Sequence, residues 1–302
     1  MEMKSLLRKH GSDIALVIGN GINLYGPAHR TNSWHDLLVK LAGKYLPARL
    51  RSVPTGVALT EFYDVLELKS TLSTSVPTLQ QEFCDLMASW QYYEHHQRIV
   101  EWAQKFDRPI LTTNFEQILS DAGNCTLHRT KKDSFTDYYP WESYYGVRQI
   151  DNPAEEFGIW HVNGMQHYRR SVRLGLSHYM GSVERARGWL HKGNERRLFS
   201  GKNMREWDGA ASWLHIVFNS PLLIFGLSLE ENEVFFRWLL IERARYFKKF
   251  PDRKKDAWYV YAGKANNGKA NNDGKQFFLE GVGVLPLHVS SYDDIYGATT
   301  WK

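Results

Sequence analysis

Short apolar runs, bounded by turn signals, recur along the chain. Each run is too short to form a buried helix, so each is predicted to be a strand of a buried sheet. The predicted strands cover Ile14–Ile18, Pro109–Leu111, Phe157–Val162, Pro221–Phe225, Trp258–Tyr261 and Val284–Val289.

Between several of these runs, apolar residues recur at the spacing of an amphipathic helix. The clearest stripe runs from Trp34 to Leu46 and follows a capping box formed by Ser33 and Asp36. Further helices are predicted to start at Phe115 and near Glu230. Because strands alternate with helices, the sequence predicts an α/β fold with a Rossmann-like parallel sheet flanked by helices.

We expect a single α/β domain over residues 1–302, interrupted by two segments of different character. Three helical patterns follow one another without a strand, which predicts a helical insertion at about 55–106. A segment at about 120–156 is rich in Tyr, Asp and Thr and predicts a long ordered loop. The repeated polar tract Lys264–Lys275 predicts a mobile loop.

Composition narrows the class of protein. With 302 residues, 43% of them hydrophobic, the chain can bury a large core. No apolar run has the length of a membrane span, so a cytoplasmic protein without a membrane partner is expected. The two cysteines, Cys84 and Cys125, lie far apart and cannot build a thiolate zinc ribbon. No metal is expected.

The charge of the chain is only weakly informative. A net charge of +5 is a small surplus for this length, so direct binding of nucleic acid is not expected. Basic residues do cluster at Arg169–Arg173 and along Arg243–Lys255. For both clusters a solvated face is favoured over a partner-binding surface.

Four polar motifs stand at the ends of predicted strands, where open α/β sheets bind ligands. They are Gly19-Asn20-Gly21-Ile22-Asn23, Thr112-Thr113-Asn114, His161-Val162-Asn163 and Gly226-Leu227-Ser228. Each motif alone also fits a structural role: a turn, a helix cap or a hydrogen-bonded histidine. Their occurrence together favours one ligand site at that edge.

As an ordered set, these motifs resemble the sirtuin-like superfamily, in its bacterial branch of NAD-hydrolysing anti-phage defence effectors. GNGIN is similar to the glycine-rich NAD loop of the family, TNSWHDLL to its tryptophan helix, and LTTNFEQIL to its threonine-threonine-asparagine motif. RLGLSHYMGS and LLIFGLSLEENEV match later motifs of the family. The resemblance extends from about Ile14 to Val289.

The resemblance implies an NAD hydrolase, with NAD as substrate, that releases nicotinamide and gives ADP-ribose. It implies that the Gly19–Asn23 loop holds the pyrophosphate, that Asn114 orients ribose and water, and that His161 accepts a proton. The other binding residues that it implies are Thr112, Thr113, Asn163, Gly226, Ser228 and Glu231. Activation would come from self-assembly or from a separate sensor subunit, as in an abortive-infection system.

The chain departs from the family pattern in two places. Asn163 stands where the family usually has a histidine before glycine, and His161 lies two residues earlier on the same strand face. The zinc ribbon of protein-deacylating sirtuins is missing. Two alternatives therefore stay open beside the hydrolase, namely an NAD-dependent protein deacylase and a non-catalytic nucleotide-binding regulatory subunit.

Overall fold

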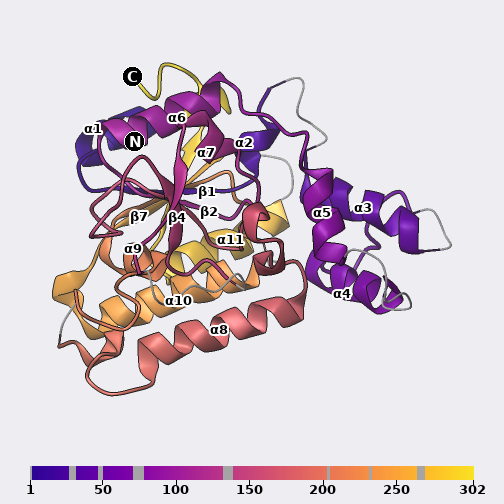
Figure 1. Ribbon diagram of the computed structural model, residues 1–302. Coiled ribbons are helices and arrows are strands. Elements are labelled where there is room, and N and C mark those ends of the chain that lie inside the picture. Colours follow the sequence, from indigo (N-terminus) through magenta and orange to yellow (C-terminus); the bar gives the residue numbers. More distant parts are fainter. Residues whose placement is uncertain are drawn as a thin grey trace.

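An eight-stranded, mostly parallel sheet forms the centre of the molecule and carries helices on both faces (Figure 1). The computed structural model describes residues 2–26, 32–46, 50–70, 78–131, 139–202, 205–230, 233–263 and 269–302. The strands are β1 (Ala15–Ile18), β2 (Ile110–Thr112), β3 (Thr126–Arg129), β4 (Ser143–Gly146), β5 (Ile159–His161), β6 (Leu222–Phe225), β7 (Ala257–Ala262) and β8 (Leu285–Val289).

The order of the strands is β3-β4-β5-β2-β1-β6-β7-β8. β5, β2, β1, β6, β7 and β8 are parallel, and β3 and β4 are antiparallel additions at one edge. Numbered along the chain, the six parallel strands follow the Rossmann order 3-2-1-4-5-6. The fold class predicted from the sequence is therefore confirmed, and the order of strands reverses between β1 and β6.

Helices cover both faces of this sheet. They are α1 (Met3–His10), α2 (Gly21–Leu24), α3 (Trp34–Tyr45), α4 (Leu59–Ser70), α5 (Leu79–Leu86), α6 (Glu94–Lys105), α7 (Ile118–Ala122), α8 (Leu176–His191), α9 (Trp213–Asn219), α10 (Val234–Lys249), α11 (Lys269–Gly281) and α12 (Asp293–Tyr296). Three short 3-10 helices cover Gln166–Ser171, Leu198–Ser200 and Pro251–Arg253.

Alternation along the strands divides the core into two layers. In β1, Ala15 and Val17 pack with α8, α9 and α10, whereas Leu16 and Ile18 pack with α1 and α6. Figure 1 shows these two groups of helices on opposite sides of the strands. Because successive side chains of a strand point to opposite faces, a strand covered on both faces must be apolar throughout. The predicted apolar runs have this character.

Helices α3, α4 and α5 form a third core of their own, beside the sheet (Figure 1). Phe115, just after β2, and Val172 belong to this core and connect it to the main domain. The helical insertion predicted at about 55–106 does not have the same bounds as this third core. α3 belongs to the cluster, and α6 packs on the sheet through Ile99 and Val100.

The structure corrects two expected loops. The segment predicted as a long loop at 120–156 contains the end of α7 and the paired strands β3 and β4. β3 is half exposed and has one aliphatic residue, Leu127, so it lacks the apolar run of the other strands. The tract Lys264–Lys275 is not a loop throughout, because α11 begins at Lys269; residues 264–268 lie outside the described part.

None of the described helices is both long and apolar enough to cross a lipid bilayer.

Candidate functional site

The loops that follow β1 and β6 are in direct contact at the point where the strand order reverses. Gly21 N–H donates to the Gly226 carbonyl (2.8 Å), and Gly19 N–H donates to the Phe225 carbonyl (3.0 Å). Gly226 has a φ of +72°, and a Cβ on Gly21 would lie 2.8 Å from Gly226 Cα. The glycines therefore permit a close approach of two loops. Their amides are used inside the fold, which differs from the phosphate-facing role expected for Gly19 and Gly21.

A cavity of about 510 Å³ opens at this switch point, within the range of small-molecule sites. One wall comes from the carboxyl ends of β1, β2, β6 and β7, and the facing wall comes from the start of α3. Residues from the sheet edge are Asn20, Gly21, Thr113, Gly226, Ser228, Tyr259 and Tyr261; residues from the facing wall include Ser33, Trp34 and His35.

The structure divides the predicted site residues into two groups. Five of them line the cavity: Asn20, Gly21, Thr113, Gly226 and Ser228. Six are buried and do not line the cavity, and the exposed fraction of the five that are not glycine is at most 2%: Gly19, Asn23, Thr112, Asn114, His161 and Asn163. Glu231 lies outside the described residues.

Asn114 and His161 are joined directly and are both shielded from solvent. His161 Nδ1 lies 2.8 Å from the Asn114 carbonyl oxygen. Because a carbonyl only accepts, Nδ1 carries the proton and Nε2 presents a lone pair. Burial lowers the pKa of His161 to about 4, so the ring is neutral near pH 7. His161 Nε2 and both amide atoms of Asn114 make no hydrogen bond to any described residue.

The threonines and Asn163 hold this region in place. Thr112 Oγ1 donates to the Ile18 carbonyl (3.0 Å) and accepts from Asn114 N–H (3.1 Å). The Asn163 amide donates to the Thr113 carbonyl at 3.4 Å. These bonds tie the ends of β1, β2 and β5 together. Thr112 is therefore a structural residue, whereas Thr113 lines the cavity.

Asn23 belongs to a buried polar network rather than to the cavity wall. Its amide donates to Asn20 Oδ1 and to Glu116 Oε1, both at 2.8 Å. Its carbonyl oxygen accepts from His96 Nε2 at 3.0 Å. Burial raises the pKa of Glu116, and the hydrogen bond from the Asn23 amide is the largest influence that opposes this rise. Asn23 thus links the glycine loop to α6 and to the loop after β2.

Glu233, which immediately precedes α10, is a cavity residue that the sequence analysis did not select. Loss of hydration, with a smaller contribution from the charge of Glu230, raises its pKa to about 7. Its protonation therefore changes close to neutral pH. The sequence offered no signal for it, because an acidic residue at a helix start is ordinarily a helix-dipole partner.

Aromatic residues form the part of the cavity that lies beyond β7. Tyr259 and Tyr261 stack with ring centroids 6.0 Å apart, and Tyr292 and Tyr296 stack at 6.5 Å. All four line the cavity, and Lys275 stands beside them. Tyr292 and Tyr296 come from the end of the chain, around the four-residue helix α12. A helix this short carries no periodicity that could reveal it in the sequence.

The chain matches no family model and no curated protein.

Proposed function

We propose that this protein is an NAD hydrolase that breaks the bond between nicotinamide and its ribose. The observation that carries the proposal is the pair Asn114 and His161. Their unpaired polar atoms are buried beside a cavity at the Rossmann switch point. Buried polar groups are nearly always hydrogen-bonded in folded proteins, so an unpaired one calls for an explanation such as a catalytic role or a bound water. The resemblance of the ordered motifs to NAD-hydrolysing effectors supports the same chemistry.

Different residues of the cavity suit the different parts of a dinucleotide. In the proposal, Asn20 faces the pyrophosphate, Gly226 and Ser228 face the adenosine ribose, and Thr113, which directly precedes the buried Asn114, faces the nicotinamide ribose. Tyr261 and Tyr292 offer aromatic surface to adenine. A Rossmann sheet binds dinucleotides across this crevice.

The proposed reaction needs little acid or base chemistry. Nicotinamide leaves as a neutral molecule, so the leaving group needs no proton from an acid of the enzyme. A water molecule attacks C1′ of the ribose, and its proton passes to His161 Nε2 or to solvent. A base with a pKa of about 4 accepts only a small share of that proton at pH 7. We therefore assign the larger part of the rate acceleration to the positioning of the reactants by Asn114.

The test is incubation of the purified protein with NAD while nicotinamide and ADP-ribose are followed by chromatography. Asn114→Ala should reduce turnover by about 10²-fold or more, the scale that misplaced reactants cost. His161→Ala should reduce it by about tenfold or more. Asn163→Ala should act mainly on KM. Wild-type rates in the Asn114 variant would contradict the proposal.

Burial of His161 favours a second candidate, a nucleotide-binding regulatory subunit without turnover. The ring is 1% exposed and does not line the cavity. A protein of that kind would bind NAD with a measurable Kd and release no nicotinamide under any condition. Calorimetric titration alongside the chromatographic assay distinguishes the two.

The resemblance also supports a biological setting for the hydrolase. We propose a cytoplasmic anti-phage effector that depletes NAD when self-assembly or a sensor subunit activates it. Expression with its genomic neighbours during phage infection, followed by measurement of cellular NAD, tests this setting. NAD that stays constant while infected cells survive would contradict it.

A further inference from the structure

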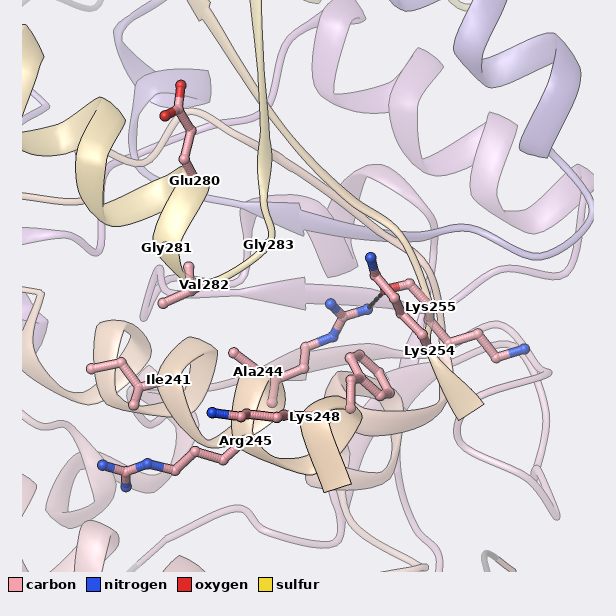
Figure 2. A pocket seen from close by; sticks show the side chains of 12 residues that line it. Ile241, Ala244, Arg245, Lys248, Lys254, Lys255, Glu280, Gly281, Val282 and Gly283 are labelled. Atoms are coloured by element: carbon pink, nitrogen blue, oxygen red, sulfur yellow. Dashed lines mark hydrogen bonds between the residues drawn. The ribbon is translucent and has the colours of Figure 1, made fainter. Parts of the chain in front are cut away.

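A second cavity, of about 590 Å³, lies at the opposite edge of the sheet, where β7 and β8 begin. Its walls are the last half of α10, the residues Lys254 and Lys255 before β7, and the turn Gly281–Gly283 between α11 and β8 (Figure 2). The candidate NAD site lies at the carboxyl ends of β1, β2, β6 and β7. The two cavities are therefore separate.

Part of the basic segment Arg243–Lys255 has a structural role. The guanidinium of Arg243 donates to the carbonyl oxygens of Val217, Ser220, Lys255 and Asp256, at 2.8 to 3.2 Å. Arg253 donates to Tyr246 Oη and the Gly201 carbonyl, and Lys249 donates to the Phe199 carbonyl. These three cations hold the fold together, so they need no ligand to explain them.

The remaining cations of the segment are not explained in this way. Lys248, Lys254 and Lys255 form no ion pair within the described part of the chain, and all three line the cavity. Arg245 also lines it and pairs with Glu242 at 2.5 Å. Figure 2 shows Lys254 and Lys255 near the start of β7 and Lys248 on α10, and the Glu280 carboxylate points away from all three.

The floor of the cavity adds a buried positive charge. Arg243 is 2% exposed, and its hydrogen bonds go to carbonyl oxygens, so no carboxylate among the described residues balances it by direct contact. Free carbonyl oxygens at the C-terminal end of a helix would repel an anion. At the end of α11, carbonyl oxygens of the last turn accept hydrogen bonds from the N–H groups of Val282, Gly283 and Val284.

Apolar side chains complete the cavity. Ile241, Ala244, Phe247 and Val282 line it between the charged groups. Lysine ammonium groups on a flexible stem are common partners of phosphates. The cavity has the volume of a small-molecule site rather than of an extended surface.

We infer that this cavity binds a small ligand that joins a flat aromatic ring to several negative charges, namely a nucleoside polyphosphate. The ring would lie against Ile241, Ala244 and Val282, and the phosphates would contact Lys248, Lys254 and Lys255. The inference does not rest on the proposed hydrolase activity. Its residues and its edge of the sheet are different.

Photoaffinity labelling tests the inference directly. The full-length protein is irradiated with 8-azido-ATP, digested, and analysed by peptide mass spectrometry. Label is expected in peptides that contain residues 241–255 or 280–283, and excess ATP should remove it. The double variant Lys254→Gln with Lys255→Gln should lower this labelling at least tenfold. Unchanged circular dichroism would show that the variant is folded.

The matched control removes the same charge elsewhere. Arg8 and Lys9 are adjacent and exposed on α1, so Arg8→Gln with Lys9→Gln should leave the labelling unchanged. Label found only in peptides of the carboxyl-edge cavity, no label at all, or equal loss in both double variants would overturn the inference. None of these outcomes alters the test for nicotinamide release.

Discussion

Asn114 and Asn23 are both buried asparagines near the same loops, and their hydrogen bonding differs. Asn23 uses its amide and its carbonyl oxygen in bonds to three side chains. Both side-chain polar atoms of Asn114 lack a partner among the described residues. An unpaired buried polar group costs about 1–3 kcal/mol of stability, whereas a fully paired one stabilises the fold. The two residues thus allow a test in which stability and activity separate.

Asn114→Leu should raise the free energy of unfolding, or leave it unchanged, and should abolish nicotinamide release. The leucine keeps most of the volume and removes the unpaired amide. Asn23→Leu is the matched control and should lower the free energy of unfolding by at least about 1 kcal/mol, because it leaves Glu116 and His96 without their partner. Urea unfolding measures both. A large loss of stability in Asn114→Leu would show that Asn114 is a structural residue.

Glu233 gives the cavity a charge that depends on pH. Its pKa is raised to about 7, so the carboxyl is neutral below that pH and ionised above it. An ionised carboxylate in the cavity repels the pyrophosphate, so NAD affinity should fall as the pH rises from 6 to 8. Glu233→Gln should remove this dependence, as measured by calorimetric titration. Glu230→Gln should move the midpoint to lower pH, because one of the two causes of the raised pKa is gone. A pH profile unchanged in Glu233→Gln would contradict this role.

At the scale of elements, the contact between the loops after β1 and β6 sets the geometry of the site. A Cβ on Gly226 would lie 2.9 Å from both the Gly19 carbonyl oxygen and Tyr296 Oη, and the residue has a φ of +72°. Gly226→Ala should therefore cost at least about 1 kcal/mol of stability. Gly181→Ala, at an open position inside α8, should instead stabilise by about 0.5–1 kcal/mol. Equal effects of the two substitutions in urea unfolding would argue against the strained approach.

Whether the sequence predicts a helix or strand depends on the type of residue that the element buries. All six parallel strands are predicted, because strands covered on both faces are apolar throughout. α8 was not predicted, because its buried stripe consists of Tyr179, Ser182, Ala186 and Leu190, of which only one is aliphatic and large. β3 and β4 pair at the edge and lack an aliphatic run. The pattern detects elements that bury aliphatic residues and misses those that bury polar or small ones.

The candidate site could be predicted only in part, for a similar reason. Residues at strand ends are brought together by the sheet, so Thr113, Asn114, His161 and Gly226 could be found from strand periodicity. Trp34, Glu233 and Tyr292 reach the cavity from separate elements whose packing no local pattern records. Hydrogen bonding also separates Asn23 from Asn114, and the sequence does not show that difference.

In the molecule as a whole, the packing of apolar side chains joins the third core to the sheet. The third core of α3, α4 and α5 is attached by packing, for example by Trp34 stacked on Phe115 with ring centroids 4.4 Å apart. Within the described residues, no group of three or more His, Cys, Asp or Glu side chains gathers to hold an ion. Incubation with EDTA should therefore leave Tm and nicotinamide release unchanged. A fall of several degrees in Tm, restored by added zinc, would contradict this expectation.

The central claim is that the buried pair beside the switch-point cavity carries out hydrolysis of NAD. The most direct measurement is the rate of nicotinamide release from NAD by the full-length protein, alone and with its genomic neighbours, compared with the folded Asn114→Leu variant. We expect equimolar nicotinamide and ADP-ribose from the wild type, without any acyl peptide, and a loss of about 10²-fold or more in the variant. Equal rates in both proteins, or NAD binding without release of nicotinamide under every condition, would contradict it.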